Sequence, residues 1–310
     1  MNFLIRFFIN VLQVLYKFAF EILEIINGFI SHFLCINPSR DIKTKYYFNG
    51  DIYKGEWKNG SRHGEGIIYY KNGDKFKGSF ENDQIFGIGT YYFNNGNILT
   101  GEFNNKFIER GILEIANGKG KYEGEFLNNK FHGKGKFMFF NGDIYEGDWK
   151  NGLKDGHGVY YYQNQSEYDG EWTNDKKNGH GIFYNRETGD SYDGNWYNGI
   201  IVKGVLNTND GDRYKGTFKD SQLDGVGEFH YKNGDIYFGE WSEGKKCGKG
   251  ILNRPDGFRY EGNFFNNKYN GQGIIYFITK IDLKANLRMV KSVDKESCIV
   301  KMAKLNVTNG

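Results

Sequence analysis

The feature that most constrains this chain is a repeat of 23 residues. Each copy begins with an aromatic residue (once Leu), any residue, Gly, any residue, and then Trp or Phe. The copies start at Tyr53, Phe76, Leu99, Tyr122, Tyr145, Tyr168, Tyr192, Tyr214, Tyr237 and Tyr260. Successive starts lie 23 residues apart, except for one step of 24 and one of 22. Such a register predicts an array of ten similar supersecondary units in place of two compact domains.

Each unit has the pattern of a β-hairpin. Residues 53–57, Tyr-Lys-Gly-Glu-Trp, alternate in type with a period of two. The alternation predicts a strand with Tyr53, Gly55 and Trp57 on one face and charged side chains on the other. A turn follows at residues 58–60, and the second strand is expected to begin at Gly64-Glu65-Gly66.

A second turn closes each unit, and Asn-Gly or Asp-Gly recurs there. The pairs are Asn49-Gly50, Asn72-Gly73, Asn95-Gly96, Asn141-Gly142, Asp210-Gly211, Asn233-Gly234 and Asp256-Gly257. Two-residue type I′ turns need positive φ at both central residues, and these pairs adopt it at little cost. The pattern therefore predicts type I′ geometry at the second turn.

The glycines inside the strands need a reason of their own. Gly weakens a strand unless something bulky must pass close to the backbone. Because aromatic residues flank these positions, we expect a ring to lie across the bare backbone. The structural positions predicted in this way are Tyr53, Gly55, Trp57, Gly64, Gly66, Tyr122, Gly124, Tyr145, Gly147, Trp149, Tyr168, Gly170, Trp172, Tyr237, Gly239 and Trp241.

The repeat resembles the MORN repeat (membrane occupation and recognition nexus). Residues 145–152, Tyr-Glu-Gly-Asp-Trp-Lys-Asn-Gly, followed by Gly-His-Gly at 156–158, carry the resemblance most clearly. It extends over roughly residues 46–278. The resemblance implies an all-β array: an elongated, single-layer antiparallel sheet of about ten stacked hairpins, roughly 95 Å long at ~4.8 Å per strand.

Two units depart from the pattern. The third begins with Leu99 and has Arg110 and Ile112 where glycines are expected. The seventh has Lys203-Gly204 in place of Gly-x-Gly. We expect a local bend, a bulge or a contact site at each of them.

Residues 1–36 change character completely. Their polar residues are Arg6, Asn10, Gln13, Lys17, Glu21, Glu24, Asn27 and Ser31. Spacings of three and four place these residues on one stripe of an α-helix. The segment is therefore predicted to be an amphipathic helix whose packing face includes Phe18, Ile22 and Ile25.

Three interpretations of this helix stay open: packing on protein, membrane association and a targeting signal. Charged residues interrupt the apolar runs, which opposes a transmembrane span. A sheet of one layer is expected to bury a face only against something else. The MORN resemblance also implies a helix laid along the repeat sheet, as in the junctophilins. Packing of residues 3–34 on the aromatic face of the sheet is therefore the preferred interpretation.

The predicted organisation has four parts. Residues 1–36 form the helix, 37–52 a half repeat and linker, 53–279 the ten repeats, and 280–310 a weakly structured tail that contains lysines. Only about 30 residues follow the last repeat, so no room is expected there for the kinase or methyltransferase domains that accompany some MORN arrays.

No catalytic, cofactor or metal site is expected. Four of the six histidines stand beside the Gly-x-Gly step, where their recurrence indicates a turn or surface role. Three widely separated cysteines provide neither a disulfide framework nor zinc spacing, which fits a reducing compartment. The interspersed charges, with a net charge of +3, give no footprint for nucleic acid.

These features indicate a non-enzymatic scaffold. We expect it to dock partner proteins in a larger cytoplasmic assembly, cytoskeletal or ciliary, such as a radial spoke. Open sheet edges favour a homodimer or a heteromer. The alternative is a membrane-tethering module that binds anionic phospholipid and is anchored by residues 1–36.

Overall fold

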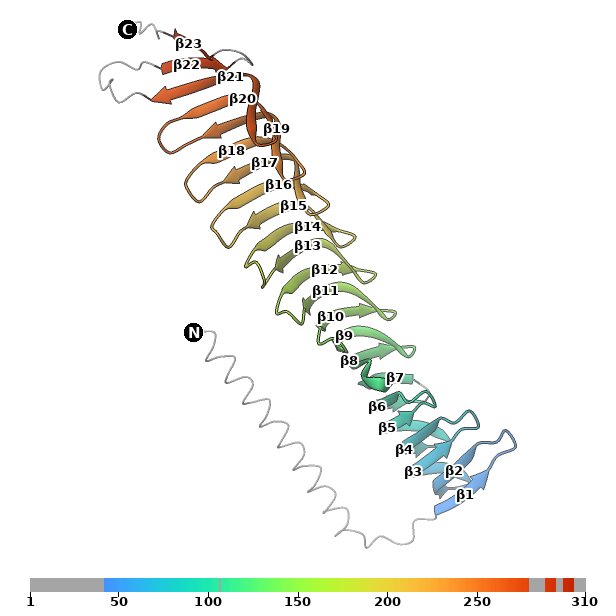
Figure 1. The fold of residues 1–310 in the computed structure, drawn as a ribbon. Helices are drawn as coiled ribbons and strands as arrows, with labels where there is room; N and C mark the ends of the chain where they lie inside the picture. The colour runs from blue at the N-terminus through green and yellow to red at the C-terminus, as the bar shows by residue number, and fades with distance from the viewer. Residues whose placement is uncertain (1–41, 106, 279–287, 294–297, 304–310) are drawn as a thin grey trace, which may run out of the picture.

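The computed structural model describes residues 42–105, 107–278, 288–293 and 298–303. These residues form one open antiparallel β-sheet that is elongated and twisted along its length (Figure 1). The predicted all-β hairpin array is therefore confirmed for this part of the chain. The helix expected over residues 1–36, with its face of Phe18, Ile22 and Ile25, lies outside the described residues. Within the described ranges, no helix has the length and apolar character needed to cross a membrane.

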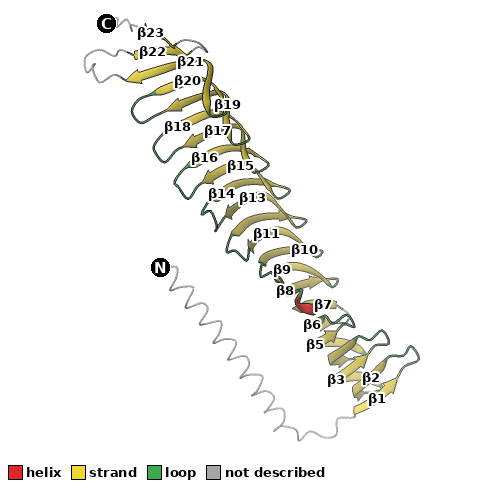
Figure 2. Cartoon of the chain, in the orientation of Figure 1, coloured by secondary structure: helices red, strands yellow, loops and turns green. Residues whose placement is uncertain are grey.

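The sheet contains 23 strands. They are β1 (Ile42–Tyr46), β2 (Ile52–Lys58), β3 (Ser61–Tyr69), β4 (Lys75–Glu81), β5 (Gln84–Tyr92), β6 (Ile98–Asn104), β7 (Phe107–Ile115), β8 (Gly120–Leu127), β9 (Lys130–Phe139), β10 (Ile144–Lys150), β11 (Leu153–Tyr161), β12 (Glu167–Thr173), β13 (Lys176–Tyr184), β14 (Ser191–Tyr197), β15 (Ile200–Asn207), β16 (Arg213–Lys219), β17 (Gln222–His230), β18 (Ile236–Ser242), β19 (Lys245–Asn253), β20 (Arg259–Phe265), β21 (Lys268–Ile278), β22 (Arg288–Val293) and β23 (Cys298–Ala303). A short 3₁₀ turn, η1 (Ala116–Gly118), lies between β7 and β8 (Figure 2).

Each strand pairs with the next one along the chain, from β1 to β23. The array is thus a continuous meander without crossovers. The last two strands fall within residues 280–310, so the sheet continues into the segment for which the sequence predicts a weakly structured tail.

In the nine units whose first turn lies wholly within the described residues, that turn is a two-residue type I′ turn. In the first unit the turn joins β2 to β3, and Asn59 and Gly60 have φ angles of 51° and 81°. Positive φ at both central residues matches the twist of the flanking strands. The same pair of positive angles recurs at Asn82-Asp83, Asn128-Asn129, Asn151-Gly152, Asn174-Asp175, Asn198-Gly199, Asp220-Ser221, Glu243-Gly244 and Asn266-Asn267.

The second turn has a different geometry, and the type I′ prediction is wrong there. The Gly73 N–H donates to the Tyr70 carbonyl at 3.0 Å, and the Tyr70 N–H donates to the Asp74 carbonyl at 2.9 Å. Three residues therefore span the turn, and among them only Gly73 has positive φ, at 92°. A three-residue connection forms a type I turn followed by one left-handed residue. Asn-Gly recurs at this turn because its Gly supplies that residue.

The two glycines of Gly-x-Gly have different roles. Strand β3 begins at Ser61, three residues before Gly64, so the sequence places its start too late. Gly55 pairs with Gly66 and Trp57 pairs with Arg62, so one residue of β2 opposes three of β3. Gly64 lies in this bulge with a φ of 62°, whereas Gly66 lies in the regular ladder. The first glycine is needed for its conformation and the second for close packing.

The aromatic rings bury one another within the single layer. The ring of Tyr145 is completely buried. It lies between Trp149 of its own unit and Trp172 of the next, with centroid distances of 5.1 and 5.3 Å and edge-to-face geometry. The same arrangement recurs at Tyr53, Phe76, Tyr122, Tyr168 and Tyr237. Within the described residues, these rings are therefore buried without a second element over them.

Hydrogen bonds also join each unit to the next. Trp172 Nε1 donates to the carbonyl of Gly158 in the preceding unit at 2.9 Å. The carboxylate of Asp143 accepts from the Gln163 N–H at 2.8 Å and from the Tyr160 hydroxyl at 2.7 Å, both in the following unit. Because such bonds recur along the strip, neighbouring hairpins are held in fixed orientation.

The third unit replaces the tyrosine ring with an isoleucine. Gly101 pairs with Gly111, so Gly111 is the second glycine of this unit. The sequence alignment, which places the two expected glycine positions at Arg110 and Ile112, is therefore wrong here. The unit is one residue shorter at its bulge. The side chain of Ile108 is 1% exposed, and its Cδ1 would lie 2.6 Å from a Cβ built at Gly111. Ile108 therefore covers the glycine pair.

The seventh unit is shortened at the same place. Gly194 pairs with Gly204, and Trp196 pairs with Ile201. The side chain of Ile201 is 2% exposed, about as deeply buried as its counterpart in the third unit, Ile108. The departures in the sequence thus mark a shorter bulge filled by isoleucine.

Candidate functional site: the two faces of the sheet

The two faces of the sheet carry different side chains. The aromatic face holds the rings that cover the glycine pairs. The outer face is the opposite one, where Lys54 and Glu56 of the first unit point. Side chains alternate between the two faces along a strand, and the paired glycines belong to the aromatic face. On the outer face, each glycine pair therefore presents only its backbone, and the residues before and after it point their side chains outward. The outer face therefore has a backbone floor that runs along the array, perpendicular to the strands.

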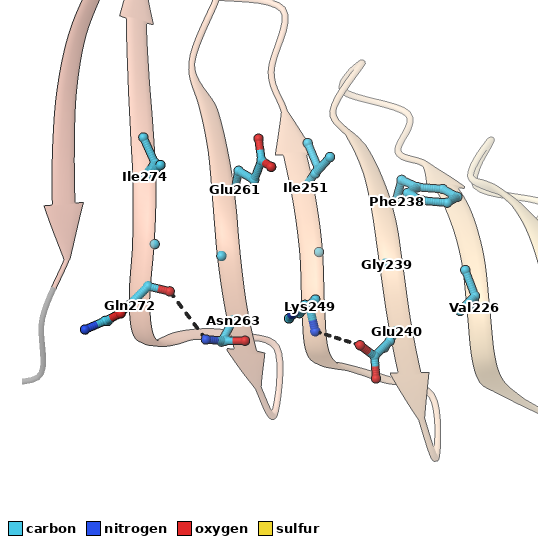
Figure 3. Close-up of a pocket in the computed structure, with 13 residues that line it drawn as sticks. Val226, Phe238, Gly239, Glu240, Lys249, Ile251, Glu261, Asn263, Gln272 and Ile274 are labelled. Atoms are coloured by element: carbon cyan, nitrogen blue, oxygen red, sulfur yellow. Dashed lines mark hydrogen bonds between the residues drawn. The ribbon is translucent and has the colours of Figure 1, made fainter. Parts of the chain in front are cut away.

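This floor widens into a groove near the C-terminal end of the array. The outer groove, of about 810 Å³, is lined by Val226, Phe238, Glu240, Lys249, Ile251, Glu261, Asn263, Gln272 and Ile274, with Gly239, Gly250, Gly262 and Gly273 between them. Figure 3 shows its two walls: Phe238, Ile251, Glu261 and Ile274 form one row, and the remaining side chains form the other.

One wall of the outer groove is largely apolar and accessible. Phe238 is 53% exposed and Ile274 is 39% exposed, and Val226 at the end of the opposite wall is 54% exposed. These three side chains are the exposed apolar part of the outer groove.

The opposite wall is held by the bulges. Glu240 accepts a hydrogen bond from the Lys249 backbone N–H at 3.0 Å. Asn263 Nδ2 donates to the Gln272 carbonyl at 3.5 Å (Figure 3). These contacts fix the polar side chains at the position where each strand bends, so the groove has a defined shape.

The floor also opens between the third and fifth units, and its walls there are charged. This region, of about 620 Å³, contains two ion pairs, Lys134–Asp148 at 2.6 Å and Lys136–Glu146 at 3.3 Å. Both lysines of this region, Lys134 and Lys136, are therefore paired with carboxylates.

His157 and His180 lie on the outer face. His157 Nε2 is 3.2 Å from Asp169 Oδ1, and His180 Nε2 is 3.0 Å from Asp193 Oδ1, with all four side chains well exposed. Two equivalent pairs in successive units indicate a surface role. No group of three metal-ligating side chains occurs among the residues that the structure describes.

The aromatic face carries a row of residues that sequence reasoning missed. The position lies nine residues after the start of a standard unit and faces the rings. It is occupied by Arg62, Ile85, Phe131, Lys154, Lys177, Leu223, Lys246 and Tyr269. Four of these residues are cations, and each lies over aromatic rings. Only alignment of the units at their first turn would have revealed this row.

Lys177 and Lys154 are the most enclosed of these cations. Lys154 Nζ lies 4.5 Å from the ring centroid of Trp172 and 4.9 Å from that of Tyr160. Burial lowers the pKa of Lys154, and the carboxylates of Asp175 and Asp143 partly oppose this. Burial lowers the pKa of Lys177 to about 8, and the positive charge of Lys154 adds to the effect.

The predicted structural positions belong mostly to the interior. Tyr53, Tyr122, Tyr145, Tyr168 and Tyr237 are fully buried, and Trp149, Trp172 and Trp241 nearly so, while Trp57 is partly buried. Gly55, Gly124, Gly147, Gly170 and Gly239 each pair with the second glycine of their unit. Of these positions, Gly239 alone lines the outer groove.

Comparison with protein families identifies the repeat. A family model described as "MORN repeat" matches residues 53–75, 76–98, 122–144, 145–167, 168–186, 192–213, 214–236, 237–259 and 260–279. The matches cover more than half of the chain. The unit between residues 99 and 121 is left out, and it is the unit that begins with Leu99 in place of an aromatic residue.

Among curated proteins, the chain is similar to alsin. It is 44% identical to alsin of Rattus norvegicus and 42% identical to alsin of Homo sapiens, in each case over 64 residues. The match covers 19% of this chain and 4% of the relative. The chain thus corresponds to a small fraction of these proteins.

Among solved structures, the chain is similar to two of Drosophila melanogaster Sas-4. The TCP domain of SAS-4 in complex with a proline-rich motif of Ana2 matches with a TM-score of 0.31 and 20% identity, covering 46% of this chain and 77% of that one. The TCP10c domain of Sas-4 gives a TM-score of 0.26 and 16% identity, covering 63% and 96%. Similarity at this level carries no information on function.

Proposed function

Because the chain belongs to the MORN-repeat family, we propose that it is a non-catalytic scaffold that docks partner proteins. The outer groove carries the proposal: its apolar wall, with Phe238 and Ile274 exposed and Ile251 partly buried between them, lies on a strip whose units are joined by rings and hydrogen bonds. A stiff support keeps such a wall in place for a partner without an ordering cost at binding. We further propose a cytoskeletal or ciliary assembly in the cytoplasm as its setting.

Capture of partners by variants tests the scaffold. The full chain, Phe238→Glu with Ile274→Glu, and Tyr197→Glu are each used to capture crosslinked proteins from an extract of the source cells. Tyr197 is the matched control, because it is 63% exposed and lies outside the outer groove. We expect proteins that bind the unaltered chain and the Tyr197 variant and are lost from the groove variant. An identical set from all three chains would contradict the proposal.

Membrane tethering is the second candidate function, and the sequence of residues 1–36 is the observation that favours it. Its apolar residues surround a narrow polar stripe, a pattern that also occurs in interfacial helices. Co-sedimentation with phosphatidylserine vesicles separates the two candidates. Binding that is lost in a chain beginning at residue 37 supports tethering, and equal or absent binding by both chains argues against it.

We also propose that the chain associates with itself or with a partner through the open edges of its sheet. An edge strand presents unpaired backbone groups to another strand. In the described residues β1 pairs only with β2. Light scattering at micromolar concentration is expected to give a mass above that of a monomer.

A further inference from the structure

We propose that Lys177 and Lys154 form an anion-binding site on the aromatic face, which holds an acidic segment of a partner protein. The inference rests on the proposed scaffold function and assigns one docking position to it. It requires that the Lys177 ammonium have N–H donors that no group of the chain accepts. It also requires that no carboxylate of the chain lie beside this ammonium.

The ammonium of Lys177 is surrounded by rings. Its Nζ lies 4.5 Å from the ring centroid of Phe183, 4.7 Å from Tyr168, 4.9 Å from Trp196 and 5.4 Å from Tyr162. The rings favour the positive charge through their π faces. They offer no strong acceptor for the three N–H donors that a lysine carries. Among the described residues, no oxygen forms a hydrogen bond or ion pair with this Nζ.

The other cations in the same row each have a polar neighbour at the next first turn. Asp83 forms an ion pair with Arg62 and accepts from its N–H. Asp175 accepts from the Lys154 backbone N–H at 2.9 Å, and Asn267 accepts from the Lys246 backbone N–H at 2.8 Å.

The corresponding residue beyond Lys177 is Gly199, whose N–H donates to the Lys177 carbonyl at 2.9 Å. The turn position that holds Asp83, Asp175 or Asn267 elsewhere therefore has no side chain here. Partly buried charges in proteins are normally paired. Lys177 is consequently the cation in this row for which an anion from outside would complete the surroundings.

Lys154 supplies a second positive charge on the same face. It occupies the same position one unit earlier, so the two side chains are separated by two strand spacings, roughly 9.6 Å. A polypeptide in the polyproline II conformation has three residues per turn and rises about 3.1 Å per residue, so carboxylates three residues apart lie on the same side, about 9.3 Å apart. An acidic segment with this spacing can contact both lysines. Both ammonium groups lie among rings rather than protruding, which disfavours contact with a flat membrane surface.

The repeats themselves provide the variants for a test. Leu223 and Ile85 stand where Lys177 does, so Lys177→Leu is expected to fold. Asp175 and Asp83 stand where Gly199 does, each with a φ of 66°. A Cβ at Gly199 would meet nothing within 4 Å. Gly199→Asp should therefore fold as well, and should place a carboxylate of the chain itself beside Lys177.

The experiment measures binding of a 12-residue peptide with Glu at every third position, and of its Gln counterpart, to the full chain. We expect the Glu peptide to bind the unaltered chain about tenfold more tightly than the Gln peptide, as hydrogen bonds to charged groups require. Lys177→Leu and Gly199→Asp should each weaken its binding about tenfold. Lys176→Leu, at the exposed neighbouring residue, should leave it unchanged. Thermal melts should show all three variants folded.

Several results would overturn the proposal. These are equal binding of the Glu and Gln peptides, no binding of either, or unchanged binding by both site variants. Binding of phosphatidylserine vesicles through Lys177 and Lys154, without binding of the peptide, would assign the site to lipid instead. The capture experiment tests the scaffold function independently of the peptide experiment. If the unaltered chain captures partner proteins but does not bind the Glu peptide, the scaffold function is supported and the anion-binding site is not.

Discussion

The ring of Tyr145 lies directly over Gly158, so closely that a Cβ at Gly158 would come within 2.5 Å of Tyr145 Cζ. The tyrosine hydroxyl then donates to the Asp148 carbonyl at 2.9 Å. Two strands are thus spanned by one side chain that is buried without any second layer. The relationship recurs along the array and explains how a single sheet supports itself.

Gly147→Val should destabilise the array strongly. A Cβ at Gly147 would lie 2.6 Å from the His157 carbonyl oxygen and 2.8 Å from Tyr145 Oη, and the backbone atom cannot move aside. We expect a loss of about 3 kcal/mol, against less than about 0.5 kcal/mol for the outer-face change Glu146→Gln. Thermal melts of both variants measure this. Equal effects would show that the faces are wrongly assigned.

Acid should weaken the contacts between units. Burial raises the pKa of Asp143, but hydrogen bonds from Tyr160, Gln163 and Asn141 outweigh it and hold that pKa below its ordinary value. A carboxyl whose folded pKa is depressed stabilises the fold above its unfolded pKa, about 3.9, and loses this as pH falls through the folded value.

Urea unfolding between pH 7 and pH 3 measures this effect. We expect stability to fall below about pH 4, and Asp143→Asn to flatten the fall, because the amide does not titrate. Parallel curves for the two chains would contradict the assignment.

Ile108 should carry more stability than an exposed isoleucine of the neighbouring unit. It fills the space that a tyrosine ring occupies elsewhere, so Ile108→Ala leaves a cavity and should cost about 2–4 kcal/mol. Ile88 is 75% exposed on the outer face, and Ile88→Ala should cost less than about 0.5 kcal/mol. Urea midpoints compare the two. A similar cost for both would mean that Ile108 does not cover the glycine pair.

The two kinds of turn should respond differently to alanine. Asn151 has a φ of 54° in a first turn, where alanine is strained, so Asn151→Ala should cost about 1 kcal/mol. Lys232 is the first of the three residues of a second turn, two positions before the left-handed Gly234, and its own φ is not positive. Lys232→Ala should therefore leave the melting temperature unchanged. If the two substitutions cost the same, the turn assignment fails.

Periodicity was sufficient to predict the hairpins, the face of Tyr53 and Trp57 and the covering of glycine by rings. These features depend on spacing within a unit, which the sequence displays directly. The second turns were mispredicted because Asn-Gly serves two turn types, and the loop length that decides between them depends on where the strands end. The third unit was misaligned because a one-residue deletion at its bulge hides Gly111.

Neither candidate site could be read from the sequence. The outer groove brings together Val226 and Ile274, which lie on strands of different units, and its depth depends on the backbone floor between them. The significance of Lys177 depends on Gly199 in the next unit. That relation becomes visible only once the contact between successive first turns is known.

The self-covered aromatic face is the central claim, and a chain beginning at residue 37 tests it most directly. If the rings bury one another, this chain should stay soluble, keep the near-ultraviolet circular dichroism of its packed tryptophans, and melt within about 4 °C of the full chain. Aggregation of the shortened chain together with loss of that signal would contradict the claim. It would show that the aromatic face needs residues 1–36 to cover it.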